Sequence, residues 1–186
     1  MIEKDTTQNA SSETSRSPRS QYFAVMIANP TSGSYAQHAQ ELEENIAFLR
    51  QSGWNVELRL TEASGDARRL AHEVVEQKAD VVIAAGGDGT INEVIQELAG
   101  SETALGVLPI GTVNVWAREM DIPLDSGGAC EVLLHGTTRR VDLGRVNDHY
   151  FQLLVGIGFD GEVTQSVENK PLNVSVCPVT CSPAYG

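Results

Sequence analysis

A glycine-rich turn at residues 86–90 constrains this chain more than any other stretch. It has the sequence Gly-Gly-Asp-Gly-Thr, follows the apolar run 81–85 and precedes the helix-like run 91–98. This order is typical of parallel α/β sheets, in which ligands bind beyond the carboxyl ends of the strands. Glycines let the backbone approach a ligand closely, and the unpaired N–H groups at a helix start favour an anion such as phosphate. A tight turn with Thr90 as the helix N-cap explains the same residues without a ligand.

Asp88 lies in the middle of this turn, where its negative charge would repel a phosphate group. The sequence leaves two roles open for its carboxylate. It acts through a metal ion, or it accepts hydrogen bonds from ordered backbone.

The rest of the chain alternates strand-like and helix-like segments. We expect strands at 22–28, 54–60, 81–85 and 104–109, helices at 36–52, 67–77, 91–98 and 124–135, and short strands at 139–141, 143–147 and 150–157. A repeated strand–helix alternation predicts a doubly wound, mostly parallel α/β sheet. The run 22–28 is apolar throughout, which is typical of a central strand, and the alternating run 54–60 is typical of a strand nearer an edge.

Two further turns follow strands of the predicted sheet. The strand at 104–109 leads into Gly111 and Thr112, a second glycine junction, so that two junctions at one sheet edge would wall a single nucleotide cleft. The first strand leads into a polar turn in which Asn29, Thr31 and Ser32 offer donors to a phosphate. Local side-chain capping explains this turn equally well. Asn114 as a helix cap and Arg118 in a surface ion pair are the structural alternatives at the second junction.

Composition excludes several classes of protein. The net charge of −12 over 186 residues argues against nucleic acid as a partner and against steady attraction to an anionic membrane. No run approaches the ~20 apolar residues that span a bilayer. The odd number of cysteines, three, and the absence of an apolar leader favour a cytoplasmic protein with reduced thiols. The Gly-Lys pair of a Walker loop and a G-x-S-x-G elbow are both missing.

Four ordered blocks give the chain a family resemblance. They are the turn Asn29–Gly33, Thr61 after the second strand, Gly86–Glu93, and Leu105–Glu119. In these blocks the chain resembles the diacylglycerol kinase catalytic family, in its bacterial soluble lipid kinase branch, over residues 22–167. NAD kinases share the G-G-D-G-T turn, but the family's L-G-x-L-P-x-G-T-x-N-x-x-A-R block favours lipid kinases. The chain departs from the pattern at Val113, often a small residue, and Val115, often Asp, which leaves the acceptor lipid open.

The resemblance implies a site for ATP and Mg²⁺ at the sheet end, with a lipid hydroxyl such as that of diacylglycerol as acceptor. The implied nucleotide-binding residues are Asn29, Pro30, Thr31, Ser32, Gly33, Thr61, Gly86, Gly87, Asp88, Gly89, Thr90, Ile91, Asn92, Glu93, Gly111, Thr112 and Asn114. Asp88 is the catalytic candidate, and no metal ligand can be named. A lipid substrate implies transient contact with a membrane surface by a cytoplasmic protein. A homodimer stays open.

The resemblance also implies a domain division. We expect a nucleotide-binding domain over 21–136 and the start of a truncated, β-rich second domain over 137–168. That second domain carries the general base in the family. The polar composition of residues 1–20, by itself, predicts a disordered tail. Residues 169–186 look unlike the family, which suggests truncation or a shifted reading frame. Three hypotheses follow: an ATP-dependent lipid kinase or its nucleotide domain, an NAD kinase-like enzyme, or a non-catalytic ATP-binding fragment.

Overall fold

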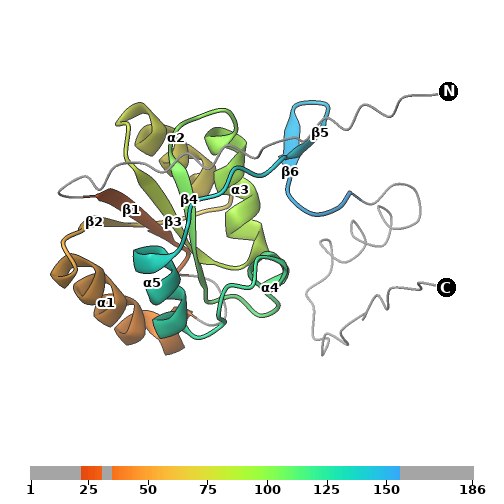
Figure 1. The fold of residues 1–186 in the computed structure, drawn as a ribbon. Coiled ribbons are helices and arrows are strands. Elements are labelled where there is room, and N and C mark those ends of the chain that lie inside the picture. Colours follow the sequence, from red (N-terminus) through yellow and green to blue (C-terminus); the bar gives the residue numbers. More distant parts are fainter. Residues whose placement is uncertain (1–21, 31–34, 156–186) are drawn as a thin grey trace, which may run out of the picture. The chain divides into compact units, whose positions relative to one another are not determined.

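The computed structural model describes residues 22–30 and 35–155. Its centre is a four-stranded parallel sheet with the strand order β2-β1-β3-β4 (Figure 1). The strands are β1 (Phe23–Ala28), β2 (Asn55–Leu60), β3 (Val81–Gly86) and β4 (Ala104–Pro109). All three strand pairings are parallel. The predicted parallel α/β sheet is therefore confirmed, with β1 in its interior and β2 at its edge.

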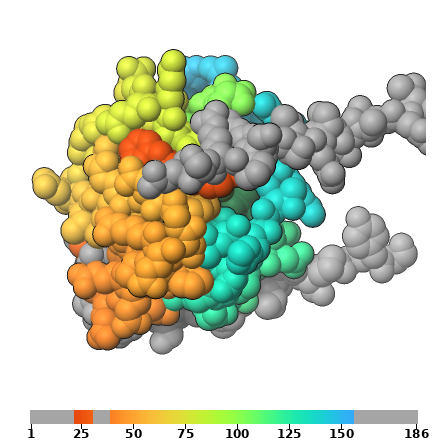
Figure 2. Space-filling model, turned by 60° about the vertical axis from the view of Figure 1, so that its left-hand side comes forward, coloured from red at the N-terminus to blue at the C-terminus, as the bar shows by residue number. Residues whose placement is uncertain are grey.

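Helices cover both faces of this sheet, as a doubly wound fold requires. The helices are α1 (Tyr35–Gln51), α2 (Asp66–Glu76), α3 (Asp88–Leu98), the short α4 (Val115–Glu119) and α5 (Ser126–His135). The helices α1 and α5 lie on one face, and α2 and α3 lie on the other (Figure 1). Figure 2 shows α1, in orange, beside α5, in teal.

Two hydrophobic cores follow from the alternation of side chains along the strands. In β1, Met26 points into the core under α1 and α5, whereas Val25 and Ile27 point into the core under α2 and α3. All three side chains are fully buried. Burying such a side chain contributes about 1.5–3 kcal/mol, so a strand that is apolar on both faces is stable only in the interior of the sheet.

A small antiparallel hairpin follows the sheet. It consists of β5 (Gly144–Val146) and β6 (His149–Phe151), joined at Asn147, which has a positive φ of 52°. Gln96 of α3 holds the hairpin because its side-chain amide pairs with the backbone N–H and C=O of Tyr150, both at 2.9 Å.

Some element boundaries differ from the prediction. Residues 139–141 form no strand, because they are exposed and pair with no strand in the described part of the chain. The strand expected over 150–157 ends at Phe151, and 152–155 are irregular. The compact unit that holds the sheet extends to Leu153. The predicted tail 1–20, Thr31–Gly33, 156–168 and the atypical segment 169–186 lie outside the described residues. No helix that the structure describes is long and apolar enough to cross a membrane.

Candidate functional site

The two glycine junctions touch each other. Strands β3 and β4 are neighbours in register, with Gly86 opposite Pro109, so both turns leave the same end of the sheet. A Cβ atom built on Gly111 would lie only 2.4 Å from the Cα of Gly87. A side chain at Gly111 is therefore incompatible with this approach. The two corners therefore meet at one end of the sheet, as the parallel topology predicts.

Asp88 fastens these corners together. Its Oδ2 accepts a hydrogen bond from the backbone N–H of Val115 at 3.0 Å, and its Oδ1 accepts one from Trp116 at 2.9 Å. The carboxylate thus occupies the amino end of α4, where the aligned peptide dipoles favour negative charge. The sequence leaves two roles open for Asp88, and the structure shows the second: its carboxylate accepts hydrogen bonds from ordered backbone. The helix α3 begins at Asp88 with Gly87 as N-cap, so the expectation of Thr90 as N-cap is wrong.

The side chain of Asn114 stabilises the second corner by hydrogen bonds to the backbone of the turn. Its Oδ1 accepts from the N–H of Gly111 at 3.1 Å, and its Nδ2 donates to the carbonyl oxygens of Pro109 at 3.1 Å and Gly111 at 2.8 Å. The residue is buried and has a φ of 54°, a conformation that asparagine tolerates. Asn114 occupies the N-cap position of α4, but its side chain caps no helix amide. Arg118 donates to the carbonyl of Val113 and has no ion-pair partner among the described residues.

A cavity of about 410 Å³ opens between these corners and the ends of β1 and β2. Its lining residues are Asn29, Thr61, Ala63, Ser64, Ala67, Gly87, Gly89, Thr90, Glu93, Gly111 and Thr112. Most of them are predicted nucleotide-binding residues, drawn from all four sequence blocks. The structure therefore brings the blocks together at the carboxyl ends of the strands, where open α/β sheets bind ligands.

The far wall of the cavity consists of residues that sequence reasoning missed. Ala63, Ser64 and Ala67 belong to the turn between β2 and α2 and to the first turn of α2. Their side chains are small and carry no motif. Only their position just after the carboxyl end of a parallel strand could have indicated them. Thr61, which was predicted, is buried, and its N–H pairs with the carbonyl of Ala28 at 2.9 Å.

Asp66 shapes this wall. Its Oδ2 accepts from the amides of Glu62 and Ala63 at 2.8 and 2.9 Å, and these bonds lower the pKa of its carboxyl group. The wall is attached to α3 by Glu93, whose carboxylate accepts from the N–H groups of Gly65 and Ala67, both at 3.1 Å. The turn is thus held on both sides by carboxylates that bind its backbone.

Several predicted residues do not line the cavity. Gly86 is buried at the end of β3, and a Cβ atom there would lie 2.4 Å from the Oγ1 of Thr90. Ile91 is buried in the core, and Asn92 is exposed. Pro30 follows the end of β1. Among the described residues, no group of three His, Cys, Asp or Glu side chains is arranged to hold a metal ion.

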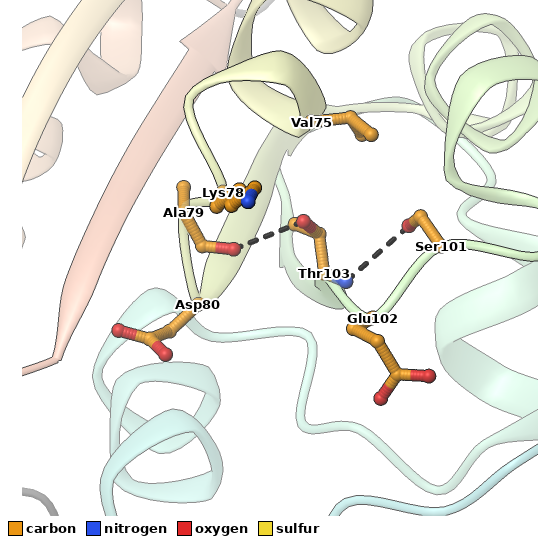
Figure 3. A pocket seen from close by; sticks show the side chains of 7 residues that line it. All are labelled: Val75, Lys78, Ala79, Asp80, Ser101, Glu102 and Thr103. Carbon is orange, nitrogen blue, oxygen red and sulfur yellow. Dashed lines mark hydrogen bonds between the residues drawn. The ribbon is translucent and has the colours of Figure 1, made fainter.

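A larger hollow of about 620 Å³ lies at the opposite end of the sheet (Figure 3). It is lined by Val75 near the end of α2 and by residues just before β3 and β4, namely Lys78, Ala79, Asp80, Ser101, Glu102 and Thr103. Thr103 Oγ1 joins the two loops by donating to the carbonyl of Ala79 at 2.9 Å, and Asp80 Oδ2 accepts from the N–H of Phe23, at the start of β1, at 3.1 Å. This larger hollow lies at the amino ends of the strands, whereas open α/β sheets bind ligands at the carboxyl ends. The cavity of about 410 Å³ is therefore the better candidate site.

Comparison with known proteins agrees with this geometry. The family model described as the diacylglycerol kinase catalytic domain matches residues 23–146. This chain belongs to that family. The matched segment begins at β1 and ends at β5, and so includes both glycine corners and the whole cavity.

Members of the diacylglycerol kinase family from two bacteria illustrate the relationship. Diacylglycerol kinases from Staphylococcus aureus strains RF122 and MRSA252 are 40% identical to this chain over 150 residues, which is 80% of this chain and 46% of theirs. The crystal structure of a diacylglycerol kinase from Bacillus anthracis superposes with a TM-score of 0.62 at 27% identity, covering 69% of this chain and 45% of that one. The chain spans about half the length of the curated relatives it matches.

Proposed function

We propose that this chain is the nucleotide-binding half of an ATP-dependent lipid kinase, which transfers the γ-phosphoryl group of ATP to a lipid hydroxyl. Diacylglycerol is the acceptor class that the names of the relatives support. The contact between Gly87 and Gly111 is the observation that carries the proposal, because it joins the two glycine corners at one cavity.

The chemistry of the cavity suits the phosphates of a nucleotide. A chain with a net charge of −12 repels a polyanion such as a triphosphate, so the site must offer hydrogen-bond donors to the phosphate oxygens. Backbone N–H groups at the start of α3 are such donors, and the hydroxyls of Thr61, Thr90 and Thr112 add to them. The N–H of Gly111 already donates to Asn114 Oδ1, so Gly111 contributes by its close approach to Gly87. The other predicted contacts, Asn29 to Gly33, would complete the phosphate site from the end of β1.

Mg²⁺ would enter with the nucleotide. Magnesium keeps several waters and is commonly held by substrate phosphates with one or two carboxylates, so it does not require a cage of three protein ligands. When bound, it neutralises charge on the transferring phosphoryl group. The carboxylates of Glu93, which lines the cavity, and of Asp88, beside the lining residues Gly87 and Gly89, already accept backbone N–H groups. We therefore assign Asp88 the role of a positioning residue that keeps the two corners aligned.

The general base and the acceptor site belong, in this proposal, to the second, β-rich half of the enzyme, which would begin near residue 137. An NAD kinase-like activity is the weaker hypothesis, because it accounts only for the turn at 86–90. The diacylglycerol kinase family model matches residues 23–146 and so includes the second corner as well. Transient contact with a membrane surface follows from the lipid acceptor, and a homodimer remains a prediction.

The proposal is tested by binding and by transfer. MgATP should raise the unfolding temperature of this chain at millimolar concentration, since a ligand that binds only the folded state stabilises it by mass action. The variant Gly111→Ala should lose this effect, because its Cβ would meet Gly87. Gly127→Ala is the matched control, since its Cβ would meet Asp125 at an ordinary 3.6 Å. Absence of any shift in the wild type would contradict nucleotide binding.

Transfer of label from ATP to diacylglycerol should then be measured for this chain and for a full-length relative. Transfer by the relative alone would identify this chain as a binding fragment. Phosphorylation of NAD with no lipid product would favour the NAD kinase-like alternative.

A further inference from the structure

Glu93 connects the two sides of the cavity. It lies on α3, is half-buried and lines the cavity. Its Oε1 accepts from the N–H of Gly65 and its Oε2 from that of Ala67, both at 3.1 Å, across 28 and 26 residues of sequence. The helix that starts at the glycine corner is thereby bonded to the backbone of the opposite wall.

The bonded N–H groups are those that a helix start normally leaves without partners. Gly65 is the N-cap of α2, has a φ of 87° and offers no capping side chain. In a capping box, two local side chains bond to the N-cap N–H and to an N–H of the first turn. Here Glu93, which belongs to α3, makes both of these bonds to α2. Its negative charge is favoured by the dipole of α2. Glu93 therefore caps the start of α2 from a distance, while Asp66 holds the turn that precedes it.

We propose that Glu93 is a positioning residue that sets the width of the nucleotide cleft by capping α2, and that it binds neither phosphate nor metal ion. This inference rests on the proposed function. Each of its carboxylate oxygens already accepts a backbone N–H, and a phosphate beside it would be repelled. What Glu93 controls is the place of Ala63, Ser64 and Ala67, which form the wall opposite Gly87 and Gly111.

Glu97 provides a matched control one turn further along α3. Its Oε1 accepts from Arg68 Nε at 2.6 Å, and its Oε2 lies 3.0 Å from His72 Nδ1. It also attaches α3 to α2, but through the exposed side chains of Arg68 and His72, and it does not line the cavity. Loss of Glu97 therefore weakens the same helix pair without moving the wall.

The experiment measures ATP affinity of the full chain by calorimetry, below the unfolding temperature, with excess Mg²⁺ and separately with EDTA. We expect Glu93→Gln to weaken ATP about tenfold in both conditions, because a glutamine has one acceptor oxygen and turns its NH₂ group against the second amide. Glu97→Gln should bind ATP like the wild type. Backbone hydrogen exchange at Gly65 and Ala67 should be faster in Glu93→Gln alone.

Unchanged ATP affinity in Glu93→Gln would overturn the inference. A loss confined to the Mg²⁺ condition would also overturn it, because that result would make Glu93 a metal ligand. If the wild type bound ATP neither with excess Mg²⁺ nor with EDTA, that result would refute the proposed function itself. If Glu93→Gln does not fold, Glu93→Asp keeps the charge but is too short to reach both amides. It should show the same loss in both conditions, whereas wild-type affinity would contradict the positioning role.

Discussion

Asp88 Oδ1 accepts a hydrogen bond from the backbone N–H of Trp116 at 2.9 Å, across 28 residues of sequence. Asp88 belongs to the first glycine corner, and Trp116 follows the second. Trp116 is itself buried in the core under α2 and α3. The bond therefore links the site to the packing of the domain, and a substitution at either corner should change the backbone geometry of the other.

Replacement of Asp88 should separate the two corners while the domain stays folded. Asp88→Ala leaves the N–H groups of Val115 and Trp116 without their acceptor, which should cost about 1–2 kcal/mol of unfolding free energy. Nucleotide-dependent activity of the enzyme that holds this domain should be abolished. Urea unfolding measures the first effect and ATP turnover the second. Turnover at the wild-type level in a folded Asp88→Ala protein would refute the role of Asp88.

Replacement of Asn114 should be more destabilising. Asn114→Ala removes three hydrogen bonds inside the Gly111 turn and leaves alanine at a φ of 54°. We expect a loss of about 4–5 kcal/mol in urea unfolding, since each of the three bonds contributes about 1 kcal/mol and a left-handed alanine costs about 1–2 kcal/mol. Asn92→Ala, at an exposed position of α3, should change stability by less than about 0.5 kcal/mol. Equal effects of the two variants would contradict the turn's dependence on Asn114.

The ion pair of Glu97 should make part of the stability depend on pH. Its hydrogen bond with Arg68, with a smaller contribution from His72, lowers the pKa of the Glu97 carboxyl group. A carboxyl group with a lowered pKa in the folded state stabilises the fold above its unfolded pKa of about 4.3, and this contribution is lost as the pH falls through the lowered value. Glu97→Gln should therefore be less stable than the wild type at pH 7, and the difference should shrink in acid. A difference that is independent of pH would contradict this assignment.

Cys130 should be chemically inert in the folded protein. It is a free thiol, fully buried between α5 and the sheet, and burial raises its pKa to about 11. Because the thiolate is the reactive form, alkylation near pH 8 should leave Cys130 unlabelled until urea unfolds the chain. Mass spectrometry of the peptide that contains Cys130 distinguishes it from the other cysteines. Rapid labelling of Cys130 in the native state would show that the thiol is accessible.

The sequence was sufficient for the parallel sheet and for the meeting of its two glycine corners. Apolar runs such as 81–85 identify buried strands, and parallel topology puts their carboxyl ends together. It was insufficient where partners lie far apart in the chain. The bonds of Asp88 to α4 and of Glu93 to α2 depend on how helices dock, which local patterns do not encode. The run 139–141 has strand-like residues, but a strand also needs a neighbour to pair with.

The central claim is that both corners hold one nucleotide together. Titration of MgATP into isotope-labelled protein, followed by NMR of the backbone amides, tests it most directly. We predict that the resonances of Gly87 and Gly89 shift together with those of Gly111 and Thr112, with one common dissociation constant. Shifts at one corner alone, or separate constants for the two corners, would contradict the claim.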